Sequence, residues 1–270
     1  MAELLKAAGI PRSSYYYHIK KSQNPDKYEH IKNEITQIYN ENQGRYGYRR
    51  ITAELHNREI AVNHKTVFRL MSAMGIKSMV RMKRYNSYRG EIGKTAPNII
   101  KRNFKAESPN KKWTTDITEF KLFGKKLYLS PILDMFNGEI VSYNISEQPI
   151  LAQVMDMLDK AFCKIPNDTG LIMHSDQGWQ YQHRRYQKRL RDKGIVQSMS
   201  RKGNCLDNAV MENFFGLLKS ELLYLRDFSS FDEFKDELEK YIWYYNNKRI
   251  KCKLKGMSPV QYRLQSSKIA

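Results

Sequence analysis

The spacing of apolar residues changes at about residue 108, and this change divides the chain into two kinds of structure. Before it, Ile31, Ile35 and Ile38 recur every three or four residues, which is typical of one face of an amphipathic helix. After it, the segment 113–120 alternates in polarity and is rich in Thr and aromatic residues, as strands are. We therefore expect an all-helical first part, followed by a domain that contains a sheet.

The second part has an order of elements that constrains its topology. Three expected strands, at 113–120, 127–134 and 139–145, are joined by short turns, so they should form an antiparallel meander. The elements that follow are a helix at 151–162, a strand at 171–176, a helix at 182–193, a strand at 195–199 and a helix at 207–224. This order predicts an α/β domain with a mixed five-stranded sheet flanked by helices, as in the ribonuclease H-like fold.

The first part has the pattern of a helix-turn-helix DNA-binding module. Apolar stripes predict helices between residues 28 and 84, and Asn63 is the expected N-cap of the last one. Lys65, Thr66 and Arg69 should then point outward near the start of that helix, where a recognition helix meets bases and phosphates. A generic helical hairpin has the same pattern, but the basic run at 81–84 favours DNA binding.

These patterns predict five segments. They are a partial helix-turn-helix segment at 1–25, a helix-turn-helix-like DNA-binding domain at 26–85, a basic linker at 86–107, a catalytic core at 108–225 and a helical C-terminal extension of that core at 226–270.

The charge of the chain points to a polyanionic partner. Its net charge is +19, and residues 1–107 alone hold 21 Lys and Arg against 9 Asp and Glu. A highly charged, merely solvated surface would not require this asymmetry, so we expect nucleic acid. The three cysteines lie far apart, no His and Cys residues have zinc-ligand spacing, and no membrane span or secretory signal is recognisable. The expected location is the bacterial cytoplasm, in association with the nucleoid.

Three carboxylates stand at unusual places in this scheme. Asp116 falls in the middle of the first expected strand, Asp176 closes the fourth, and Glu212 lies one turn into the long helix. Because a strand rarely carries a charge without a partner, a divalent cation is the usual reason for such a carboxylate. Mg²⁺ prefers hard oxygen ligands, and two such ions can promote phosphoryl transfer.

The segments around these carboxylates resemble a known family. The matching strings are WTTDIT at 113–118, HSDQG at 174–178, GNCLDNAVMENFF at 203–215, YIWYYNNKR at 241–249 and GMSP at 256–259. Together they resemble the retroviral-integrase superfamily, and within it the insertion-sequence transposases with an Asp-Asp-Glu (DDE) triad. The chain is most similar to the second-reading-frame (OrfB-type) subunit of elements with two frames.

The resemblance implies a metal-dependent DNA transposase that cleaves and joins strands at the ends of an insertion sequence. Asp116, Asp176 and Glu212 would be the catalytic residues and would bind two Mg²⁺ ions, for which Mn²⁺ can substitute. Lys219, seven positions after Glu212, would contact DNA, and Asn208 would orient the substrate or the glutamate from the same helix face. The implied partners are double-stranded DNA, both terminal inverted repeats and target, and further copies of the chain.

Other acidic residues, and one histidine, have simpler interpretations. Glu119, Asp134 and Glu221 are expected to be surface charges, because parity or helical spacing separates Glu119 and Glu221 from the triad. His174 should face the same side as Asp176, in a structural role.

Two other functions remain open from the residues. A DNA-binding regulator could carry an inactive catalytic domain, although the full triad is present. A ribonuclease H-like enzyme that hydrolyses RNA–DNA hybrids would share the metal chemistry, but it would not need the basic helices.

We also expect an upstream-frame subunit. The short helix before residue 9 gives the helix at 13–21 little to pack against, and relatives are commonly made as frameshift fusions.

Overall fold

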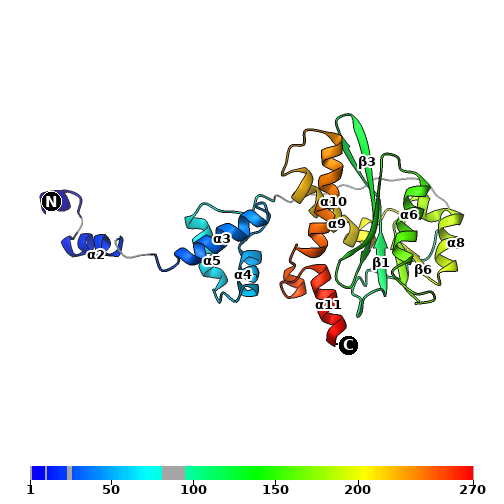
Figure 1. Cartoon of the computed structure of the whole chain (residues 1–270), viewed down its shortest axis with the longest axis horizontal. Coiled ribbons are helices and arrows are strands. Elements are labelled where there is room, and N and C mark those ends of the chain that lie inside the picture. The colour runs from blue at the N-terminus through cyan, green and yellow to red at the C-terminus, as the bar shows by residue number, and fades with distance from the viewer. Residues whose placement is uncertain (1, 10, 23–25, 81–94, 270) are drawn as a thin grey trace. The chain divides into compact units, whose positions relative to one another are not determined.

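The computed structural model describes residues 2–9, 11–22, 26–80 and 95–269, shown in Figure 1. The chain forms two compact units, Met1–Ser78 and Met79–Ala270. The basic run expected at 81–84 and the first part of the expected linker lie outside the described residues. None of the described helices is long and apolar enough to cross a membrane.

The first unit is helical, as expected. Its helices are α1 (Ala2–Ala7), α2 (Arg12–Ser22), α3 (Glu29–Glu41), α4 (Tyr48–Asn57) and α5 (His64–Ala73). The core buries apolar side chains of the last three helices: Ile35, Ile38, Ile51, Leu55, Val67, Leu70 and Met71. The Asn63 side chain accepts a hydrogen bond from the backbone N–H of Lys65 at 2.8 Å, which confirms the expected N-cap.

The second unit is built on one mixed sheet. Its strands are β1 (Lys112–Thr115), β2 (Thr118–Leu122), β3 (Lys125–Asp134), β4 (Ile140–Ser146), β5 (Ile172–Ser175) and β6 (Val196–Met199). β3 pairs antiparallel with β1, β2 and β4, whereas β5 pairs parallel with β1 and β6. The predicted antiparallel meander within a mixed sheet is therefore confirmed.

The sheet has six strands where five were expected, because the first expected strand is interrupted. β1 and β2 keep a single register against β3, with Thr115 opposite Ile132 and Thr118 opposite Leu129. The interruption is at Asp116, whose carboxylate accepts the N–H of Ile117 at 2.7 Å. Asp116 thus lies at a break between two strands and not in the middle of one.

Helices cover both faces of this sheet (Figure 1). One face carries α6 (Leu151–Phe162), α7 (Trp179–Gln182) and α8 (Arg184–Asp192), and the other carries α9 (Ala209–Leu218) and α10 (Phe231–Asn247). The 3₁₀ turn η1 (Cys205–Asn208) precedes α9, the π-helical turn η2 (Lys219–Leu223) follows it, and η3 (Cys252–Leu254) and α11 (Pro259–Ile269) follow α10.

Side chains of β1 and β2 point alternately into two separate apolar cores, one on each face of the sheet. Trp113 packs with residues of α6 and α8, whereas Phe120 packs with residues of α9 and α10. By strand parity Asp116 shares the face of Phe120, so it lies on the side that α9 covers.

The described part of the expected linker is folded onto the sheet domain. The N–H of Ala96 contacts the Met199 sulfur at 3.2 Å, and the N–H of Ile99 donates to the Ser198 hydroxyl at 2.9 Å. Ile100 is buried. The linker prediction is therefore wrong for residues 96–107, because β6 offers this segment an edge and an apolar surface to pack against.

Candidate active site

Asp116 and Asp176 follow two neighbouring parallel strands at the same level. Thr115 at the end of β1 pairs with Ser175 at the end of β5, and each is followed directly by an aspartate. Both carboxylates are half-buried. Burial, and then the negative charge of Asp176, raise the pKa of Asp116 well above its usual range. Burial also raises the pKa of Asp176. A cation would relieve this repulsion.

The Asp176 carboxylate is held by the loop that follows it. It accepts the N–H of Gly178 at 2.9 Å. A Cβ atom at residue 178 would come within 3.0 Å of the Asp176 Oδ1 atom and 3.1 Å of the Gln180 Oε1 atom. Glycine therefore lets the backbone come close to the carboxylate.

Asn208 is hydrogen-bonded to Asp116. Its amide nitrogen donates to the Asp116 carboxylate at 3.3 Å, and its amide oxygen accepts from the Thr114 hydroxyl at 2.9 Å. The Asn208 side chain is buried, with 3% of the residue exposed. It is thus placed to orient the Asp116 carboxylate at the break between β1 and β2.

Glu212 lies in the first turn of α9, half-buried, above the same face of the sheet. Burial raises its pKa, and its negative charge adds to the increase in the pKa of Asp116. Within the described ranges, however, no three Asp, Glu, His or Cys side chains are gathered closely enough to hold a metal ion. The described triad residues are therefore near one another without forming a compact cluster, and the negative charges of Asp176 and Glu212 both act on Asp116.

Lys219 begins the π-helical turn η2 and lies over the same sheet face. Its ammonium nitrogen is 5.7 Å from the centroid of the Phe120 ring. Burial lowers the pKa of Lys219, while the charges of Glu119 and Asp116 act in the opposite direction. The lysine is half-buried and adds positive charge beside Asp116.

Tyr181 lies near the two aspartates and was not predicted from the sequence. Tyr181 is 1% exposed, and its hydroxyl is 3.5 Å from the Thr115 hydroxyl. Burial, followed by the charges of Asp116 and Asp176, raises its pKa well above the usual range, so the phenol stays neutral. No sequence signal separates Tyr181 from the other tyrosines.

His174 is structural, as expected. One ring nitrogen is 2.9 Å from the Ser198 hydroxyl, and the other is 2.9 Å from the backbone oxygen of Asp207. Burial lowers its pKa. Since both ring nitrogens are engaged, neither is available to a metal ion.

The expectation of surface charges is confirmed for Glu119 and wrong for Asp134 and Glu221. Glu119 is partly exposed and pairs with Lys126 at 3.1 Å. Asp134 is 0% exposed and accepts from Arg263, whereas Glu221 is 1% exposed and pairs with Arg249 at 2.7 Å. Their arginine partners lie far along the chain, so spacing could not reveal them.

The predicted DNA-contacting residues of α5 lie in the first unit. Lys65 and Arg69 are exposed, and Thr66 is half-buried. The Arg69 guanidinium is 5.4 Å from the centroid of the Tyr28 ring. A cationic surface is therefore present on the expected helix.

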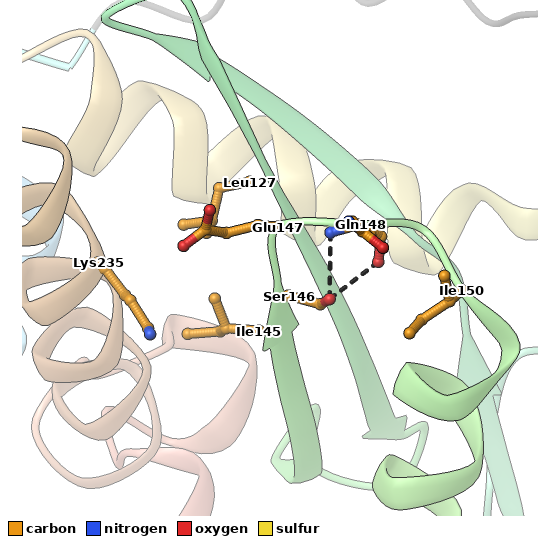
Figure 2. A pocket seen from close by; sticks show the side chains of 7 residues that line it. All are labelled: Leu127, Ile145, Ser146, Glu147, Gln148, Ile150 and Lys235. Atoms are coloured by element: carbon orange, nitrogen blue, oxygen red, sulfur yellow. Dashed lines mark hydrogen bonds between the residues drawn. The ribbon is translucent and has the colours of Figure 1, made fainter.

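A separate hollow of about 330 Å³ lies between β3, β4 and α10. Figure 2 shows Lys235 facing Glu147 and Ile145 across it, with Ser146 and Gln148 hydrogen-bonded at its edge. None of the three carboxylates lines this hollow, so it is not part of the candidate site.

Comparison with known proteins finds three family models that match parts of the chain. The integrase core domain family matches residues 106–205, a second integrase core domain family matches residues 212–266, and an HTH-like domain family matches residues 26–84.

Several relatives are similar over nearly the whole chain. The putative transposase InsK for insertion sequence element IS150 of Escherichia coli K12 is 56% identical, over 98% of this chain and 93% of the relative. The transposase for insertion sequence element IS904 of Lactococcus lactis is 38% identical, over 93% of this chain and 100% of the relative. Among solved structures, the HTLV-2 integrase catalytic core domain in complex with magnesium is 20% identical, with a TM-score of 0.47, over 58% of this chain and 98% of that one.

Proposed function

Because the chain belongs to the insertion-sequence transposases with an integrase core domain, we propose that Asp116, Asp176 and Glu212 form its catalytic site. The protein is a polynucleotidyl transferase that acts in DNA transposition. The observation that carries the residue assignment is the placement of Asp116 and Asp176 at the ends of adjacent parallel strands, in matched register.

The donor set fits divalent cations. Two half-buried carboxylates with raised pKa values lie side by side, and Glu212 adds its negative charge beside Asp116. These three residues would hold two Mg²⁺ ions, or Mn²⁺. Such ions, when bound, activate the attacking oxygen and stabilise the leaving one in phosphoryl transfer.

The surrounding residues have supporting roles in this proposal. Asn208 keeps the Asp116 carboxylate in place through its hydrogen bond. Lys219 adds a positive charge on the same face and binds a phosphate of the DNA. Lys65, Thr66 and Arg69 bind the ends of the element through α5.

The assembly we propose consists of several copies of the chain on the terminal inverted repeats and the target DNA, at the nucleoid. An upstream-frame subunit completes end recognition. Leu4, Tyr16 and Tyr17 expose large apolar side chains that this subunit would cover.

A labelled linear DNA carrying the flanking sequences of the gene, incubated with the chain and Mn²⁺, tests the function. Strand-joined products are expected. Hydrolysis of RNA–DNA hybrids without joining would indicate the ribonuclease alternative, and binding without cleavage would indicate the regulator.

A further inference from the structure

A cationic hollow of about 430 Å³ lies outside the residues assigned above. It is lined by Asn98, Lys101, Arg102 and Arg201. The first three come from the segment that was expected to be a linker, and Arg201 lies in the loop between β6 and η1. Lys101, Arg102 and Arg201 are all exposed, so the hollow is open to a ligand.

A single buried carboxylate organises this hollow. The Asp207 side chain is 0% exposed, and it accepts hydrogen bonds from Arg102 Nε at 2.8 Å and Arg201 Nε at 2.9 Å. It also accepts from the Asn98 amide at 3.0 Å. The hydrogen bonds from Arg201, followed by the one from Arg102, hold the pKa of Asp207 well below its usual range. Asp207 therefore stays charged and fixes both guanidinium groups.

The hollow carries more positive charge than Asp207 can neutralise. One carboxylate faces two arginines and Lys101, which leaves two positive charges near the opening. The side chains of Arg102 and Arg201 remain 44% and 59% exposed. A guanidinium whose position is already fixed loses little entropy on binding an anion, and its planar N–H groups suit phosphate oxygens.

The hollow is linked through the backbone to the catalytic carboxylates. Asp207 faces the arginines, whereas the next residue, Asn208, donates to Asp116. The backbone oxygen of Asp207 is in turn held by His174. A DNA strand that reaches Asp116 can therefore place another of its phosphates near Arg102 and Arg201.

We propose that Lys101, Arg102 and Arg201 form a binding site for a backbone phosphate of the DNA whose reacting phosphate lies at Asp116 and Asp176. This site rests on the proposed function, since it takes DNA as the ligand. In addition, the segment at 96–107 and the loop after β6 would then contact the same DNA strand.

The test measures binding of the full chain to a fluorescein-labelled linear duplex in EDTA, as a function of KCl concentration. Lys101→Gln and Arg102→Gln should each reduce the slope of log affinity against log salt by about one. Lys101 is the cleaner variant, because no hydrogen bond joins its side chain to Asp207 among the described contacts. Its removal therefore leaves the network around the carboxylate intact.

Arg189→Gln is the matched control. Arg189 is also an aspartate-paired arginine, with a side chain 47% exposed, but it lies on α8 over the other face of the sheet. The slope of log affinity against log salt for Arg189→Gln should equal that of the parent. Unchanged slopes for Lys101→Gln and Arg102→Gln, or an equal decrease for Arg189→Gln, would overturn the proposal.

The same measurements separate this proposal from the proposed function. Suppose that the parent chain joins strands, and that Lys101→Gln and Arg102→Gln show the same slope of log affinity against log salt as the parent. The proposed phosphate site is then wrong, and the transposase assignment stands. If the parent neither binds nor cleaves DNA, both are wrong.

Discussion

At Asp116, burial and the neighbouring Asp176 carboxylate both favour the protonated form of the side chain. Its pKa is raised by burial, by the charge of Asp176 and by that of Glu212, while the N–H of Ile117 and the charge of Lys219 oppose this. The native state therefore holds this proton more tightly than the unfolded chain does. Protonation of Asp116 thus contributes to the free energy of unfolding at acid pH. This contribution is lost as pH rises through the raised pKa.

Replacing Asp116 by Asn should therefore stabilise the metal-free protein at neutral pH. The expected gain of about 1 kcal/mol corresponds to about 2–4 °C in a domain of this size. Thermal unfolding in EDTA measures it, and the difference between Asp116→Asn and the parent should shrink as pH falls toward the usual Asp range. Adding Mg²⁺ should raise the melting temperature of the parent more than that of the variant. A variant that melts lower than the parent in EDTA at neutral pH would contradict this account.

Among the elements, the π-helical turn η2 is held by a buried ion pair. Glu221 on η2 accepts from Arg249 at 2.7 Å and from the Tyr241 hydroxyl at 3.0 Å. The Arg249 side chain is 2% exposed. The pair thus joins the turn that carries Lys219 to α10 and the residues after it.

Arg249→Met should destabilise the second unit by about 3–5 kcal/mol, because it leaves the Glu221 charge buried without its partner. The double variant Glu221→Leu, Arg249→Met should recover part of this loss. Urea unfolding measures both.

Arg226→Met is the control for this pair. The Arg226–Glu237 ion pair is more exposed, at 34% and 21% of the two side chains. Arg226→Met should therefore lower the free energy of unfolding by only about 0–1 kcal/mol. Equal losses for Arg249→Met and Arg226→Met would show that burial of the pair is not the cause.

Helix α5 is the element proposed to recognise the ends of the insertion sequence. Lys65→Ala with Arg69→Ala should weaken binding to those ends and reduce the salt slope by about two, one for each phosphate contact. Lys32→Ala on α3 removes a cation that is paired with Asp26 at 2.6 Å, and it should leave the slope unchanged. If the α5 variant keeps the parent slope, another surface binds the DNA.

Across the whole molecule, local patterns predicted the elements and missed the contacts between distant segments. Asn63 and the apolar stripes defined the helical unit, and short turns defined the meander. The break at Asp116 depends on its own carboxylate hydrogen bond, which strand periodicity cannot reveal. Asp134 is buried because Arg263 reaches it from α11. Neither that contact nor the packing of 96–107 on β6 has a local signal.

We propose that the three carboxylates carry out the chemistry, while the much larger positive charge of the chain binds the DNA. Removing one carboxylate hardly changes a net charge of +19. Binding and cleavage should therefore respond differently to the same substitution.

Strand cleavage and DNA binding measured together on Asp116→Asn, Asp176→Asn and Glu212→Gln test this most directly, with Asp156→Asn on α6 as a surface control. Each triad variant is expected to lose cleavage in Mg²⁺ and in Mn²⁺ but to bind DNA as the parent does, while Asp156→Asn retains both. Cleavage by any triad variant within a few-fold of the parent would remove that residue from the catalytic site and contradict the account.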